Sequence, residues 1–107
     1  LHRRDDKHFT PGVGEYRIIP GDTDIDDLIM SHVSTNFDRT GFYQDVNLVF
    51  PVDRLRELQE QGEVGEIAEY HYAFMGATPP TAMEAVAKDL AATLKTDGVN
   101  GVVLAGV

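Results

Sequence analysis

The sequence predicts a small α/β domain with a mainly parallel sheet and flanking helices. Three features support this fold class. An amphipathic helical pattern begins near Thr78, Gly98 ends it, and a valine-rich apolar run follows at 99–104. A helix, a glycine turn and a buried strand, in this order, form half of a parallel α/β unit. We therefore expect a Rossmann-like half whose last strand has no helix after it, so that the domain is incomplete at its C-terminal end.

The composition is that of one small domain. The chain has 107 residues, of which 42% are hydrophobic, and a formal net charge of −9. A chain with this negative charge is poorly suited to binding phosphate backbones, so nucleic acid is not an expected partner. No apolar stretch approaches the ~18 residues of a membrane span. There is no cysteine, which excludes disulfides and a cysteine nucleophile within these residues. We expect a cytoplasmic location.

The N-terminal residues are expected to carry little regular structure. Residues 1–15 are polar and interrupted by proline and glycine, which predicts a flexible arm, with the α/β domain spanning 16–107. An extended segment is expected from Tyr16 to Ile19. The turn dipeptide Pro20-Gly21 then stops it.

The middle of the chain alternates between apolar runs and polar stretches. A buried strand is predicted at Leu28–Val33, followed by a long loop at Ser34–Asp45. Alternation of apolar and polar residues predicts an extended segment at Val46–Phe50. A short helix should open at Pro51 and stop at Gly62.

The C-terminal helix is the clearest element. Residues 64–74 lack a helical period and are expected to form a strand or loop before it. Thr78 is a suitable N-cap, with Pro79 at the first helical position. Four apolar residues then recur at three- and four-residue spacing and predict a face toward the core: Met83, Val86, Leu90 and Leu94.

Two histidines are the first candidates for chemistry, because histidine titrates near neutrality. His32 lies at the carboxyl end of the predicted strand Leu28–Val33, and ligands of open α/β sheets bind at such ends. A hydrogen-bonded core histidine is the competing interpretation. His71 lies between two tyrosines, and aromatic packing competes there with a role in a site.

Charged residues offer a second set of candidates. Arg39 is able to bind a carboxylate through two parallel hydrogen bonds, with Asp38 orienting it, although a surface ion pair of little consequence is equally compatible. His32, His71 and Asp45 together would make a two-histidine, one-carboxylate metal site. No sequence spacing supports that metal hypothesis.

Several long strings resemble a known family. They are Ile29–Thr35, Phe37–Phe42, Gln44–Leu55, His71–Gly76 and Asp97–Leu104. Together they resemble the N-terminal part of the glycine/sarcosine/betaine/D-proline reductase selenoprotein B family. The resemblance runs from about Tyr16 to Val107 and does not specify the substrate.

The resemblance implies a redox centre that this sequence does not contain. In that family the strand corresponding to Val102–Val107 leads into a motif of selenocysteine or cysteine, two residues, then cysteine. We expect this redox pair just after Val107, for example behind a UGA codon read as stop. The implied reaction is reductive cleavage of a C–N bond in an amine or amino-acid-like substrate, and the chain by itself is expected to be inactive.

Site residues follow from the resemblance together with residue chemistry. His32 and His71 are assigned to proton transfer or substrate orientation, Arg39 with Asp38 to a substrate carboxylate, and Asp45 to an ammonium group. Substrate contacts are also expected at Met75 and Gly76 within the string 71–76. A homo-oligomer or a partner subunit is expected, because the fragment should expose apolar surface. A non-catalytic binding or interaction domain of the same fold is the alternative.

Overall fold

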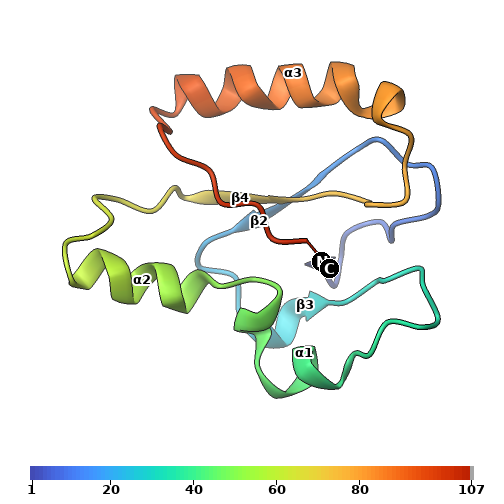
Figure 1. Cartoon of the computed structure of the whole chain (residues 1–107), viewed down its shortest axis with the longest axis horizontal. Helices are drawn as coiled ribbons and strands as arrows, with labels where there is room; N and C mark the ends of the chain where they lie inside the picture. Colours follow the sequence, from blue (N-terminus) through green and yellow to red (C-terminus); the bar gives the residue numbers. More distant parts are fainter. Residues whose placement is uncertain (107) are drawn as a thin grey trace.

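The computed structural model describes residues 1–106, which contain short strands and helices joined by long loops (Figure 1). The strands are β1 (His2–Arg3), β2 (Arg17–Pro20), β3 (Leu28–Ile29) and β4 (Tyr70–Ala73). The α-helices are α1 (Thr40–Gln44), α2 (Val52–Glu60) and α3 (Pro80–Thr96), and two 3-10 helices are η1 (Ile25–Asp27) and η2 (Val46–Leu48). The α/β class is therefore confirmed at this coarse level.

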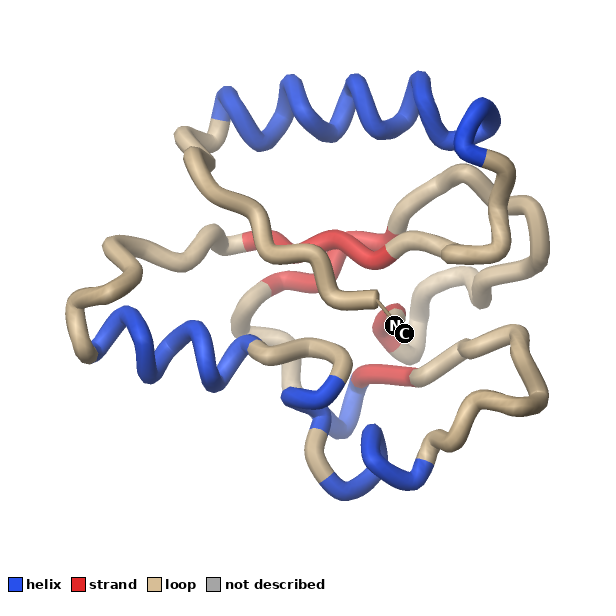
Figure 2. The backbone as a smooth tube through the Cα atoms, viewed as in Figure 1, coloured by secondary structure: helices blue, strands red, loops and turns tan. Residues whose placement is uncertain are grey.

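The sheet topology differs from the prediction. β1 pairs with β3 and β2 with β4, both antiparallel, giving two separate two-stranded sheets. The expected mainly parallel sheet with a Rossmann-like half is therefore wrong. After α3 the chain turns back in the direction of β4 (Figure 1), but residues 99–106 form no strand and are drawn as loop (Figure 2).

The predicted buried strand at 99–104 is accordingly wrong as well. Val102 is 62% exposed and Leu104 is 91% exposed. A strand exists only where its backbone groups pair with a neighbour. Within residues 1–106, β4 pairs with β2 and with no other strand. The apolar composition of 99–104 therefore predicted a burial that residues 1–106 do not provide. Val107 lies outside the described residues.

Helix α3 confirms the helical pattern of the C-terminal part. Leu90 is buried, and the other three apolar residues of the predicted face are partly buried. Gly98 follows the helix with a φ of 76°, a conformation that glycine adopts without steric cost. The predicted N-cap is wrong: the helix begins at Pro80, and the Thr78 hydroxyl donates to the Val13 carbonyl oxygen at 2.8 Å.

The segment between β3 and α2 is more helical than predicted. Val46–Leu48 forms a 3-10 helix instead of the expected extended segment. The side chain of Asp45 accepts a hydrogen bond from the Asn47 backbone N–H at 2.9 Å, and this local turn replaces strand pairing. The predicted loop at Ser34–Asp45 contains α1, and the predicted strand at Leu28–Val33 is reduced to two residues. Helix α2 confirms the prediction after Pro51.

The core lies where β2, β3 and η2 meet. Ile19, Leu28 and Val46 are its buried apolar residues. The N-terminal arm contributes to the interior, since β1 pairs with β3 and both His2 and Phe9 are buried. None of the helices in residues 1–106 has the length and apolar content needed to cross a membrane.

Candidate functional site

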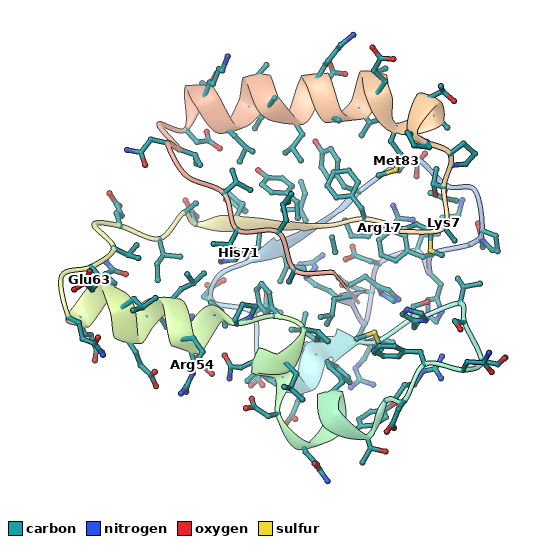
Figure 3. All side chains as sticks on the ribbon, viewed as in Figure 1. Lys7, Arg17, Arg54, Glu63, His71 and Met83 are labelled. Atoms are coloured by element: carbon teal, nitrogen blue, oxygen red, sulfur yellow. The ribbon has the colours of Figure 1, made fainter. Side chains whose placement is uncertain are left out.

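Strand alternation places His71 against the core. His71 lies directly opposite Ile19 in the β2–β4 ladder, and residues opposite each other in an antiparallel pair share a face of the sheet. Ile19 is only 1% exposed. The His71 ring contacts the Phe50 ring edge-on, with 5.1 Å between the ring centroids. Figure 3 shows His71 between the β2–β4 ribbon and helix α2.

An open groove of about 310 Å³ runs beside His71. Helix α2 contributes one set of lining residues, and the turn after β2 together with the segment entering β4 contributes the other. The lining includes Gly21, Asp22, Arg56, Gln59, Glu69 and His71. A basic, an acidic and a titratable group thus share one concave surface, and a few converging polar groups of this kind orient ligands in small-molecule sites.

The Nε2 atom of His71 is buried, and within residues 1–106 it has no hydrogen-bond partner. A Cβ added at Gly21 would lie 3.5 Å from this nitrogen, so the Gly21 backbone packs closely against the His71 ring. Burial chiefly, and the charge of Arg56 in addition, lower the pKa of His71 from its usual value of 6.5. The ring is therefore neutral at pH 7, and one of its two nitrogens is able to accept a proton.

A hydrogen-bond network holds Arg56 at the groove. Its guanidinium donates to the Gly21 carbonyl oxygen at 2.6 Å and to the Asp53 carboxylate at 3.0 Å. Asn47 in turn donates to Asp53 at 3.1 Å and accepts from the Asp53 backbone N–H. Hydrogen bonding, first from Asn47 and then from Arg56, lowers the pKa of Asp53. The carboxylate is thus ionised at pH 7 and fixes the cation.

His32 lies in a different setting. Its ring stacks on Phe37 with 4.1 Å between centroids, and its Nδ1 accepts from the Ser34 backbone N–H at 3.1 Å. Arg39 donates to the His32 backbone carbonyl oxygen at 2.7 Å. The structure therefore brings His32 and Arg39 together, but the Arg39 guanidinium bonds to the backbone of its own loop.

The other predicted site residues are also engaged locally. Asp38 accepts from the Thr40 backbone N–H at 2.9 Å, and Asp45 accepts from Asn47. Hydrogen bonds from the side chain and then the backbone of Thr40 lower the pKa of Asp38, and those from the side chain and then the backbone of Asn47 lower the pKa of Asp45. Met75 is buried and Gly76 is exposed in the segment after β4. Of the predicted set, only His71 lines the groove.

The metal hypothesis finds no support in the geometry. Across residues 1–106, no three His, Cys, Asp or Glu side chains lie close enough together to hold a metal ion. His32, His71 and Asp45 in particular occupy a loop, a strand and a helix cap.

Sequence reasoning missed the residues that surround His71. Val52, Arg56 and Gln59 on α2 all line the groove. Their spacing of i, i+4 and i+7 places them on one helical face. The buried Val52 marks that face as turned toward the core. Helical periodicity starting from Val52 would therefore have identified Arg56, whereas Asp22 and Glu69 carry no comparable signal because they lie outside regular elements.

Comparisons with known proteins agree with the resemblance noted above. Residues 11–107 match the family described as glycine/sarcosine/betaine reductase selenoprotein B. The D-proline reductase subunit gamma of Acetoanaerobium sticklandii is 32% identical over 97% of this chain. A betaine reductase complex component B subunit beta from Peptoclostridium acidaminophilum is 35% identical over 67% of it. A glycine reductase complex component B subunit gamma from Carboxydothermus hydrogenoformans is 40% identical over 57%.

The chain spans less than half of the length of these relatives. It covers 43% of the D-proline reductase subunit, 17% of the betaine reductase subunit and 14% of the glycine reductase subunit. No solved structure matches the chain.

Proposed function

Because this chain belongs to the glycine/sarcosine/betaine reductase selenoprotein B family, we propose that it is a component of a reductase that cleaves a C–N bond of an amine or amino-acid-like substrate. Its relatives are named as subunits of D-proline, betaine and glycine reductases. D-proline, betaine and glycine are all small molecules in which nitrogen is bonded to carbon. The part that this chain plays is to position such a substrate and to handle a proton.

The reaction requires two electrons that the chain cannot supply. Breaking the C–N bond reductively puts hydrogen on the carbon and leaves the nitrogen as an amine. A selenolate or thiolate is the nucleophile for this chemistry, since the anion is the reactive form. The chain has no cysteine. We therefore propose that a selenocysteine or cysteine pair outside residues 1–107, regenerated by a dithiol, provides the electrons.

His71 is the residue of this chain best suited to the proton. The observation that carries this assignment is the buried Nε2, which has no hydrogen-bond partner in the part of the chain that the structure describes, beside an open groove. A neutral imidazole accepts a proton or a hydrogen bond from a substrate ammonium group, or from the selenol or thiol that must ionise.

A partner subunit is part of the proposal. Val102, Val103 and Leu104 are each more than 60% exposed, and consecutive exposed apolar residues favour a protein interface. The relatives from P. acidaminophilum and C. hydrogenoformans are named as subunits of complexes. We propose that the chain acts within such a complex and not alone.

Product analysis tests the proposed reaction. The tagged chain would be purified anaerobically with its bound partners and supplied with a dithiol and, in turn, D-proline, betaine, glycine or sarcosine. We expect C–N cleavage of at least one substrate, with one dithiol oxidised for each bond broken. Dithiol oxidation without a cleaved product would contradict the reductase proposal. An intact complex that cleaves none of the four substrates would contradict it as well.

A further inference from the structure

The groove beside His71 carries opposite charges on its two sides. Helix α2 contributes the Arg56 guanidinium, whereas Asp22 and Glu69 come from the turn after β2 and from the segment entering β4. A simple anion would be repelled by the two carboxylates, and a simple cation by the guanidinium. Charge complementarity therefore favours a small zwitterion, with its negative end toward α2.

Arg56 differs from Arg39 in its position, because Arg56 lines the groove beside His71 and Arg39 does not. The Asp53 carboxylate and the Gly21 carbonyl oxygen each accept one hydrogen bond from Arg56. A guanidinium carries about five N–H donors in a planar fork, so these contacts occupy only part of it. Its side chain is 50% exposed and lines the same groove as His71. The bonds already made fix the fork without covering it, which lowers the entropy cost of binding a ligand.

We propose that Arg56 is the residue that recognises the substrate's carboxylate, and so determines specificity for amino-acid-like substrates over simple amines. This inference deepens the proposed function and rests on it for the identity of the substrate. With the carboxylate on Arg56, the ammonium end of a small zwitterion points toward Asp22 and Glu69. Its carbon–nitrogen bond then lies beside His71.

Helix α2 itself provides a matched control. Arg54 is 60% exposed and forms an ion pair with Glu57 at 2.8 Å, but it does not line the groove. Figure 3 shows Arg54 on the side of α2 away from His71. Arg54→Gln and Arg56→Gln remove the same charge from the same helix, and only the second removes it from the groove.

Two probes separate recognition of the carboxylate from a general effect on the groove. Betaine carries a trimethylammonium group and a carboxylate, and choline replaces the carboxylate with a neutral hydroxymethyl group. Binding of each to the full chain would be followed by NMR through the His71 ring signals. In the wild-type chain we expect betaine to bind more tightly than choline. Arg56→Gln should weaken the binding of betaine by roughly 10- to 100-fold, the effect of a lost charge-assisted hydrogen bond. Arg54→Gln should leave the binding of betaine unchanged.

Each other outcome overturns the inference. If Arg56→Gln weakened the binding of betaine and of choline equally, Arg56 would be a structural residue. If the variant bound betaine as tightly as the wild-type chain, Arg56 would have no role in recognition. Failure of the wild-type chain to bind betaine at all would also overturn it. Should Arg56→Gln fail to fold, Arg56→Lys replaces it, with a smaller but selective loss of betaine expected because lysine lacks the fork.

Failure of the inference is distinguishable from failure of the reductase proposal. Betaine binding to the chain requires no electron transfer. If the chain bound betaine selectively but the complex cleaved no C–N bond, only the proposed reaction would be contradicted. If a complex with Arg56→Gln cleaved the substrate with an unchanged KM, only the inference about Arg56 would be contradicted.

Discussion

His71→Gln is expected to lower kcat/KM of the assembled reductase by roughly 10²- to 10⁴-fold, the usual contribution of a positioned acid–base group. Glutamine retains a polar side chain of similar reach but has no titratable nitrogen. Amine release under anaerobic conditions, with the dithiol in excess, measures the effect. The amide spectrum of the isolated variant checks that the β2–β4 pairing survives.

A second measurement separates a proton-transfer role of His71 from packing alone. Burial, and to a lesser extent the Arg56 charge, place its pKa below 6.5, and the groove around it also carries Asp22 and Glu69. The neutral ring is the active form, so kcat/KM of the wild-type complex should fall as the pH drops through this lowered pKa. His71→Gln should abolish this acid limb. His8→Gln, in the N-terminal arm, should keep both the rate and the limb. An acid limb that persists in His71→Gln would rule out His71 as the proton acceptor.

Ile19→Ala is expected to reduce the free energy of unfolding by about 2–5 kcal/mol. Ile19 is 1% exposed and packs with Leu28 and Val46 in the core, so truncation removes buried apolar contacts and leaves a cavity. Small domains are stable by only about 5–15 kcal/mol. The loss is therefore a large part of the total, and urea unfolding followed by circular dichroism measures it.

The neighbouring residue supplies the control for this substitution. Ile18 is 45% exposed and points to the other face of the same strand. Ile18→Ala should therefore change the free energy of unfolding by about 0.5 kcal/mol or less. Because Ile19 lies opposite His71, Ile19→Ala should also disturb the His71 ring signals. Equal destabilisation by the two substitutions would contradict the assigned face of β2.

The helices could be predicted from the sequence because their signals are local. Residues of α3 meet at three- and four-residue spacing within one element, and the glycines that end α2 and α3 are visible in the sequence. Strand pairing, in contrast, is set by residues far apart. Nothing in the residues of 99–104 says whether a neighbouring strand is present to pair with them, and nothing near Arg17–Pro20 says that Tyr70–Ala73 is its partner.

The candidate site could be predicted only in part, because some of its signals are local and others depend on residues far apart in the sequence. His71 could be found because its residue type singles it out. Its groove could not, because Arg56, Gly21 and Glu69 meet only after β2, α2 and β4 are assembled. Arg39 and Asp45 attracted attention by charge, yet their hydrogen bonds are with neighbours seven and two residues away.

Mapping substrate contacts on the whole chain tests the central claim most directly, since that claim places the substrate at the groove beside His71. Backbone amide shifts of the labelled chain would be followed while betaine, D-proline or glycine is added. The account predicts that at least one ligand shifts Gly21, Glu69 and His71 and leaves the loop from His32 to Arg39 unmoved. Shifts centred on that loop, with none at the groove, would contradict it.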